Sequence, residues 1–278
     1  MSSVHIAVLG LGAEASAVAL SLAQAGAEVI GFDVRPPANS PVPLAESIAD
    51  AVAGADVVLS LNSPTASLRI AEQAAPHLAD GALFADLNAG TPALKVKIAA
   101  VIPGDMFVDV GMLPAADADG PVTLAAAGAQ AVRLSELLAP LGLSIAVVSD
   151  RVGDAAARVL TRSILAKCVA GVVVDYMWAA EAMGLSEWAY GELLAEFDAL
   201  SAETAKRYLT QTVSNPKRAE IEMVDIVEML DSVDYHSIFV PPTQLIYNRI
   251  YHSIKVPFGT AAEQERFEHQ GDAPAADW

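Results

Sequence analysis

Basic residues are scarce in this 278-residue chain: 16 Lys and Arg stand against 34 Asp and Glu, which gives a formal net charge of −18. A protein that binds nucleic acid needs a basic surface to neutralise phosphates, and the sequence contains no basic stripe. We therefore expect an acidic protein without a nucleic-acid partner.

Cysteine and long apolar runs are also nearly missing. A single cysteine, Cys168, excludes an internal disulfide framework and suits a reducing compartment. Because it lies in an apolar run, we expect a buried, unreactive thiol. The most apolar stretch, 164–174, is interrupted by Lys167 and is too short to cross a bilayer. The first residues lack the basic region of a signal peptide. We expect a cytoplasmic protein without a membrane anchor, and we expect no metal site.

The first 33 residues carry the most specific pattern in the chain. An apolar run over 4–9 breaks into Gly-Leu-Gly-Ala-Glu-Ala, continues as an alanine-rich helix to Ala25, and is followed by a second apolar run that ends on Asp33. Strand, glycine turn, helix and strand in this order form the context of a dinucleotide-binding fingerprint. Gly10 would allow the tight turn, and Gly12 would let the backbone approach a pyrophosphate at the helix N-terminus. The alternative is an ordinary turn with incidental glycines.

The acidic residue that ends the second run bears on the choice of cofactor. Asp33 is placed to accept hydrogen bonds from a ribose and would repel a 2′-phosphate, which favours NAD. Arg35, two residues on, could pair with such a phosphate, so NADP stays possible.

Apolar strand-type runs and helices alternate up to about residue 150, as in a doubly wound α/β sheet. Ligands of such sheets bind at the carboxyl ends of the strands, which makes the segments 61–63 and 88–90 site candidates by position. We expect the cofactor to be bound by residues from these loops and from the glycine-rich turn: Gly10, Leu11, Gly12, Ala13, Glu14, Asp33, Val34, Arg35, Leu61, Asn62, Ser63 and Asn88.

The second half of the chain is helical in pattern. No proline interrupts 154–183, and a helix of that length would span ~45 Å. Further helices are predicted over 187–209, 215–230 and 244–253, with a break over 235–242. The expected architecture is a Rossmann domain over 1–150 and a helical substrate and dimerisation domain over 151–278. A long helix with apolar stretches needs more cover than one small helical domain offers, so we expect a homodimer.

With these features the chain resembles the β-hydroxyacid dehydrogenase superfamily, and within it the phosphogluconate-dehydrogenase-like branch. The segment 86–92, Asp-Leu-Asn-Ala-Gly-Thr-Pro, is similar to the family's Asp-x-Ser/Asn-x-x-x-Pro loop, which lies beside nicotinamide and substrate. The segments 153–167 and 217–223 resemble the branch's interdomain helix and last domain. The resemblance implies a Rossmann domain, a long interdomain helix, a helical domain interleaved in a dimer, and hydride transfer with NAD(P). Asn88 in this loop could hold the nicotinamide carboxamide or the reacting oxygen, or it could simply cap a turn.

Two departures from the family pattern bear on the chemistry. The glycine-rich substrate loop is replaced by 110–114, Val-Gly-Met-Leu-Pro, which supplies no serine for a carboxylate; Met112 is expected to contact substrate there. The position of the usual catalytic lysine is occupied by Val159, which cannot exchange a proton.

Other residues are candidates for the vacant role. Ser163 and Lys167 follow Val159 at one-turn intervals on the same helix face. Lys167, desolvated among apolar neighbours, could act as acid or base, or its stem could pack while its head reaches water. Ser163 occupies the place of a substrate-binding asparagine of the superfamily. Arg218 could clamp a substrate carboxylate, or pair with Glu222 on the surface.

The leading hypothesis is an NAD(P)-dependent oxidoreductase that passes hydride between nicotinamide and a small hydroxy acid or carbonyl compound. Imine reduction stays open, because imine reductases share this architecture and often lack the lysine. A dinucleotide-binding protein without turnover is the alternative from another class, supported by Val159 and the altered substrate loop. A non-redox enzyme that retains the nucleotide is a weaker one.

Overall fold

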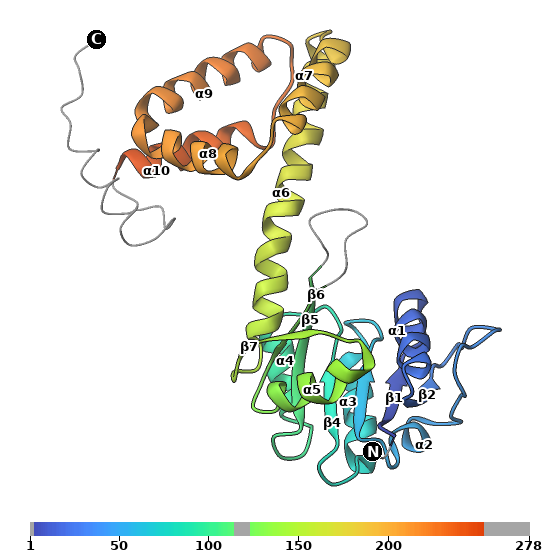
Figure 1. Cartoon of the computed structure of the whole chain (residues 1–278). Coiled ribbons are helices and arrows are strands. Elements are labelled where there is room, and N and C mark those ends of the chain that lie inside the picture. Colours follow the sequence, from blue (N-terminus) through green and yellow to red (C-terminus); the bar gives the residue numbers. More distant parts are fainter. Residues whose placement is uncertain (1–2, 114–122, 253–278) are drawn as a thin grey trace. The chain divides into compact units, whose positions relative to one another are not determined.

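The structure is a computed structural model that describes residues 3–113 and 123–252 (Figure 1). The chain divides into two compact units, Met1–Ile164 and Leu165–Trp278. The predicted domain boundary at 150/151 falls just before helix α6 (Asp154–Ala182), whereas the two units divide within that helix. In the described parts of the chain, no helix is long and apolar enough to span a membrane.

The first unit is built on a seven-stranded sheet in the order β2-β1-β3-β4-β5-β6-β7. All neighbouring strands are parallel except β5 and β6, which are antiparallel. The strands are β1 (His5–Leu9), β2 (Glu28–Phe32), β3 (Val57–Ser60), β4 (Leu83–Asp86), β5 (Phe107–Leu113), β6 (Thr123–Ala127) and β7 (Ile145–Ser149). The predicted α/β fold with a helical C-terminal region is confirmed.

Helices cover both faces of this sheet because its strands are apolar on both sides. In β1, Ile6 and Val8 pack with α1 (Ala13–Gln24) and α5 (Ala131–Leu138), while Ala7 and Leu9 pack on the opposite face. That opposite face is covered by α2 (Ile48–Val52), α3 (Ser67–Ala74) and α4 (Pro92–Ala99). This alternation is the two-residue period of a strand buried on both faces.

Strand β2 lies on one side of β1 in the sheet, and β3 lies on the other side. The order of the strands therefore reverses at β1. The carboxyl ends of β1 and β3 therefore open a crevice between their loops, which is where doubly wound sheets bind ligands.

Helix α2 begins at Ile48, after a segment that runs in an extended form. Residues 43–45 run beside β2, where the Gly31 N–H donates to the Pro43 carbonyl and the Ala45 N–H donates to the Gly31 carbonyl. Ser47 then caps the helix by accepting a hydrogen bond from the backbone of Asp50 at 3.1 Å.

The second unit contains the later part of α6 and four further helices: α7 (Ser186–Asp198), α8 (Ala202–Ser214), α9 (Pro216–Asp231) and α10 (Val240–Tyr251). The single helix predicted over 187–209 is wrong, because Ser201 caps a new helix by accepting from the Thr204 N–H at 3.1 Å. The predicted break over 235–242 is too long, since Pro241 and Pro242 lie in the first turn of α10, where a missing N–H costs nothing. The end of the helix predicted over 244–253 falls outside the described residues.

A buried carboxylate joins α6 to the segment before α10. Asp175 accepts hydrogen bonds from the hydroxyls of Tyr235 (2.7 Å) and Ser237 and from the backbone N–H groups of Ile238 and Phe239. Burial opposes the charge of Asp175, but these hydrogen bonds outweigh burial and lower the pKa of its carboxyl below the ordinary value. Burial and the bond to Asp175 raise the pKa of Tyr235 to about 12.

Candidate functional site

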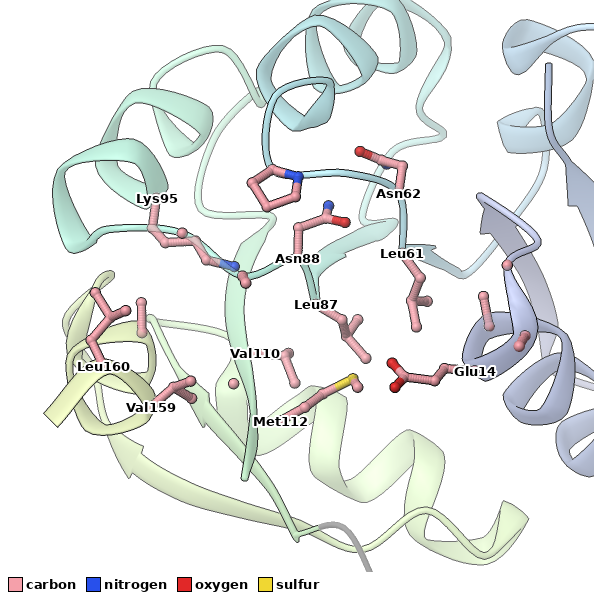
Figure 2. A pocket seen from close by; sticks show the side chains of 18 residues that line it. Glu14, Leu61, Asn62, Leu87, Asn88, Lys95, Val110, Met112, Val159 and Leu160 are labelled. Atoms are coloured by element: carbon pink, nitrogen blue, oxygen red, sulfur yellow. The ribbon is translucent and has the colours of Figure 1, made fainter. Parts of the chain in front are cut away.

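A cavity of about 600 Å³ opens at the carboxyl ends of β1, β3, β4 and β5 in the first unit (Figure 2). Its wall comes from the glycine-rich turn, the loops after β3 and β4, strand β5 and the beginning of α6. The lining residues are Gly12, Ala13, Glu14, Ala15, Leu61, Asn62, Pro64, Leu87, Asn88, Ala89, Gly90, Lys95, Val110, Gly111, Met112, Ala156, Val159 and Leu160.

Several residues predicted from the sequence meet in this cavity, and others do not. Those that line it are Gly12, Ala13, Glu14, Leu61, Asn62, Asn88 and Met112. Gly10 and Leu11 belong to the same glycine-rich turn, but both residues are buried. Asp33, Val34 and Arg35 follow β2, and Ser63 follows Asn62 without lining the cavity.

The glycine-rich turn is held from two sides. Gly10 has a φ of +98°, and a Cβ on it would come within 2.3 Å of the Leu61 carbonyl oxygen, so the loops after β1 and β3 touch through bare backbone. One carboxylate oxygen of Asp33 accepts from the Leu11 N–H at 2.7 Å, and the other accepts from the Arg35 N–H at 2.8 Å. Gly12 caps α1, and a Cβ there would meet nothing within 4 Å.

Substitution of these two glycines should have two different effects, one on stability and one on dinucleotide binding. Gly10→Ala should lower the melting temperature of the ligand-free protein, because the methyl group collides with backbone that cannot move aside. Gly12→Ala should leave the melting temperature unchanged and weaken dinucleotide binding, because its methyl group enters the space beside the helix N-terminus. Calorimetry of both variants with and without NADH separates the effects; equal affinity of Gly12→Ala and the parent protein would show that no ligand approaches this backbone.

A buried lysine that was not among the predicted site residues also lines the cavity. Lys95 is 1% exposed, and its Nζ lies 2.8 Å from both the carbonyl oxygen and Oδ2 of Asp86 and 3.4 Å from Oδ1 of Asp109. Two of its N–H groups donate to Asp86, and its contact with Asp109 is an ion pair without a hydrogen bond. Lys95 lies on the buried face of α4 together with Ile98, three residues later. In the sequence, its partners Asp86 and Asp109 are marked only as acidic residues within apolar strands.

The second carboxylate of this cluster also anchors α6. Oδ2 of Asp109 accepts from the backbone N–H groups of Gly153 (3.1 Å) and Ala156 (3.0 Å). A carboxylate at this place satisfies otherwise unpaired donors and complements the helix dipole. Lys95, Asp86 and Asp109 therefore join α4, β4, β5 and the first turn of α6.

Two asparagines face each other across a serine hydroxyl. The Ser60 Oγ accepts from Nδ2 of Asn62 (2.8 Å) and from Nδ2 of Asn88 (3.0 Å), and Asn88 Nδ2 also donates to Asp86 Oδ1. The contact with the Asp86 carboxylate, which can only accept, identifies the nitrogen end of the Asn88 amide. The amide oxygens of Asn62 and Asn88 are left buried without a hydrogen-bond partner among the described residues. A ligand with N–H or O–H groups would satisfy them.

The wall at the position of the family's lysine is apolar. Val159 and Leu160 line the cavity beside Met112 and Val110 (Figure 2). Strand β5 and α6 approach so closely here that a Cβ on Gly111 would lie 2.7 Å from Val159 Cγ2.

Some expectations for α6 are wrong. Lys167 is exposed in this chain, so its ammonium is not desolvated by its apolar neighbours. Cys168 is also exposed, contrary to the expected burial. Both follow because sequence neighbours on a helix point in different directions and do not cover one another. Ser163 is half-buried and does not line the cavity of the first unit.

In the last domain, Arg218 is exposed on α9, and no ion pair with Glu222 is present among the described residues. The ion pair on this helix joins Lys217 to Glu220 at 3.0 Å, and Asn248 of α10 donates to the same carboxylate. The catalytic and substrate roles assigned to Ser163, Lys167 and Arg218 stay predictions.

Comparison with known proteins identifies the first unit. Residues 5–142 match the family model described as the NAD-binding domain of 6-phosphogluconate dehydrogenase. The match covers just under half of the chain, and this part is similar to that family. The matched segment contains strands β1 to β6 and carries most of the cavity wall.

Solved structures share the fold of nearly the whole chain. A conserved hypothetical protein from Sinorhizobium meliloti is 26% identical, with 97% of this chain and 96% of that one covered and a TM-score of 0.58. A conserved protein of unknown function, described as similar to 3-hydroxyacid dehydrogenases, is 22% identical, with 97% and 100% covered and a TM-score of 0.59. An imine reductase variant from Myxococcus stipitatus with bound NAD⁺ is 18% identical, with 96% and 100% covered and a TM-score of 0.70. The predicted resemblance to hydroxyacid dehydrogenases and imine reductases is confirmed at the level of the fold.

Proposed function

We propose that this protein is an NAD(P)-dependent oxidoreductase that transfers hydride between nicotinamide and a small hydroxy acid, carbonyl or imine compound. The observation that carries this proposal is one cavity in which the glycine-rich turn of the NAD-binding domain meets Asn88 of the Asp86–Pro92 loop. When bound there, the dinucleotide would supply or accept the hydride.

The residues present fit a dinucleotide. The open space beside Gly12 and the N–H groups at the start of α1 suit the pyrophosphate. Asp33 accepts two backbone N–H groups, and its remaining lone pairs can take ribose hydroxyls. The unpartnered amide oxygens of Asn62 and Asn88 would accept from hydroxyl or amide N–H groups of the ligand.

The chain's own part in the reaction is positioning and the exclusion of water. The Asn88 amide is held in one orientation because its nitrogen donates to Asp86, which in turn accepts from Lys95. Leu87, Val110, Met112 and Val159 supply apolar walls around the space that remains for substrate. Preorganised polar groups in a dry cavity lower the barrier chiefly by orientation.

A panel of oxidised and reduced substrate pairs tests the proposal. Absorbance of reduced nicotinamide should change with at least one member among β-hydroxy acids, amines and their oxidised forms. A dinucleotide-binding protein without turnover is the second candidate, favoured by Val159 in the wall. It would give saturable NADH binding and no absorbance change with any pair.

We propose NAD(H) rather than NADP(H) as the preferred cofactor. Asp33 is fixed by two backbone bonds at the end of β2, where its charge would repel a 2′-phosphate. Titration of the protein with both reduced cofactors should give tighter NADH binding, and Asp33→Asn should narrow the difference. An imine reductase with this fold has been solved with NADP⁺, so tighter NADPH binding is the contrary result to look for.

We also propose a homodimer formed through the helices of the second unit. Of the described apolar residues from 165 onward, Ala180, Ala189 and Leu230 alone are fully buried. Large apolar side chains stay exposed in the single chain, among them Trp178 (52%), Trp188 (60%), Tyr190 (55%) and Leu194 (50%). An exposed apolar surface of this kind marks an interface, and a second copy of the chain would cover it.

Light scattering should therefore give twice the chain mass of 28.8 kDa at micromolar concentration. Trp188→Glu should shift the mass toward the monomer, because Trp188 lines two apolar grooves among the described helices of this unit, one beside Met183 and one beside Leu193. Glu187→Gln, at the exposed neighbouring position, is the control. A monomer mass for the parent protein would refute the dimer.

A further inference from the structure

We propose that the substrate occupies this cavity as a cationic nitrogen compound, an iminium ion in the direction of reduction, with Glu14 as its counter-ion. This inference rests on the proposed hydride transfer and narrows its substrate class.

The charges around the cavity are negative. Glu14 lies in the first turn of α1, and its carboxylate points into the cavity near Met112 (Figure 2). It has no ion-pair partner among the described residues. Lys95 is the one cationic side chain among the lining residues, and it lies between two carboxylates, so the buried cluster carries a net charge of about −1. A substrate carboxylate would be repelled here, and a cation would be attracted.

The hydrogen-bonding groups of the wall point to the same class. Lys95 donates to two oxygens of Asp86 and forms an ion pair with Asp109, and the amide nitrogens of Asn62 and Asn88 contact Ser60 and Asp86. Apart from the two amide oxygens proposed to bind the dinucleotide, the acceptor that the side chains offer a substrate is the Glu14 carboxylate. A carbonyl or carboxylate substrate needs donors, whereas an iminium or ammonium nitrogen brings its own.

The proton balance explains an apolar wall at Val159. Hydride adds with its electron pair to the iminium carbon, and the π pair of the C=N bond becomes the lone pair of a neutral amine. No proton has to come from the protein. Hydride addition to a ketone would leave an alkoxide that must be protonated, and the place of the usual donor is taken here by Val159 and Leu160.

The first test compares charge classes on the full-length protein. With NADH, 2-methyl-1-pyrroline should be reduced with a kcat/KM at least ~100-fold above that of cyclopentanone. The rate should fall as pH rises through the pKa of the imine itself. Efficient reduction of the ketone or oxidation of β-hydroxy acids would overturn the inference while upholding the proposed oxidoreductase.

The second test removes the counter-ion. Glu14→Gln should raise KM for the imine ~10–100-fold with little change in kcat, measured at saturating NADH. Glu72→Gln, an exposed position on α3, makes the same change in net charge and should have no effect. An equal KM for Glu14→Gln and Glu72→Gln would overturn the role of Glu14.

The third test does not depend on turnover. Calorimetry on the NADH-saturated protein should show binding of pyrrolidine, a cation at neutral pH, and none of cyclopentanecarboxylate; Glu14→Gln should abolish the difference. If pyrrolidine binds but no substrate pair changes the nicotinamide absorbance, the oxidoreductase proposal fails and the cation site stands. Preferential binding of the carboxylate would refute the cation site.

Discussion

Replacing Lys95 by Met should lower the free energy of unfolding of the NAD-binding domain by about 3–5 kcal/mol. The ammonium is buried and is the shared partner of Asp86 and Asp109 (2.8 and 3.4 Å), so its removal leaves two uncompensated carboxylates in the core. Chemical denaturation followed by circular dichroism measures the loss. NADH binding should weaken as well, because Asp86 also holds the Asn88 amide.

Two variants make this prediction specific. Lys97→Met changes an exposed lysine of the same helix and should alter stability by no more than about 0.5 kcal/mol. Lys95→Met combined with Asp109→Asn removes one of the stranded charges and should recover part of the loss. If Lys95→Met is as stable as Lys97→Met, the buried cluster is not ionised as described.

Asp175→Ala should destabilise the second unit by about 3 kcal/mol, since it removes the carboxylate that accepts from two hydroxyls and from the Ile238 N–H. Glu181→Ala, at an exposed position of the same helix, is the control. Denaturation followed by the fluorescence of Trp178 and Trp188 reports on this unit. Equal loss in both variants would mean that the hydrogen bonds of Asp175 contribute nothing to stability.

The same variant should flatten the dependence of stability on pH. The pKa of Asp175 is lower in the folded protein, so its contribution is present above the ordinary Asp pKa of about 3.9 and is lost as pH falls through the folded value. The pKa of Tyr235 is raised to about 12, so its contribution is present below the ordinary value of about 10 and is lost as pH rises toward the folded one. In Asp175→Ala, the loss of folding stability should therefore be smaller both at low pH and at high pH.

The fold and the glycine-rich turn could be predicted because their signals are local. Strand period, the two glycines and the alanine-rich helix follow one another within 25 residues, and Asp33 closes the pattern. The site beyond this turn was less accessible. Lys95 meets Asp86 and Asp109 only because α4, β4 and β5 pack together, and nothing near Lys95 in the sequence marks it as buried.

Helix ends and exposure were the other source of error. One serine at a cap position, Ser201, divides a stretch whose periodicity alone favours one helix. Lys167 and Cys168 lie in an apolar run but are exposed in the structure. An apolar run therefore predicts the composition of a surface, but it does not predict whether other residues bury that surface.

The close approach of β5 to α6 has a consequence for how this cavity can diversify. A Cβ on Gly111 would lie 3.0 Å from the Ala155 carbonyl oxygen, a tight contact with backbone that favours glycine there whatever residue stands at 159. The Val159 side chain, in contrast, borders the open cavity. The scaffold thus separates a position that holds the helix against the sheet from a position that sets the chemistry. In related sequences, residue 111 should be invariant glycine while residue 159 varies freely, and a single codon change at 159 could move the protein between reaction classes without refolding it.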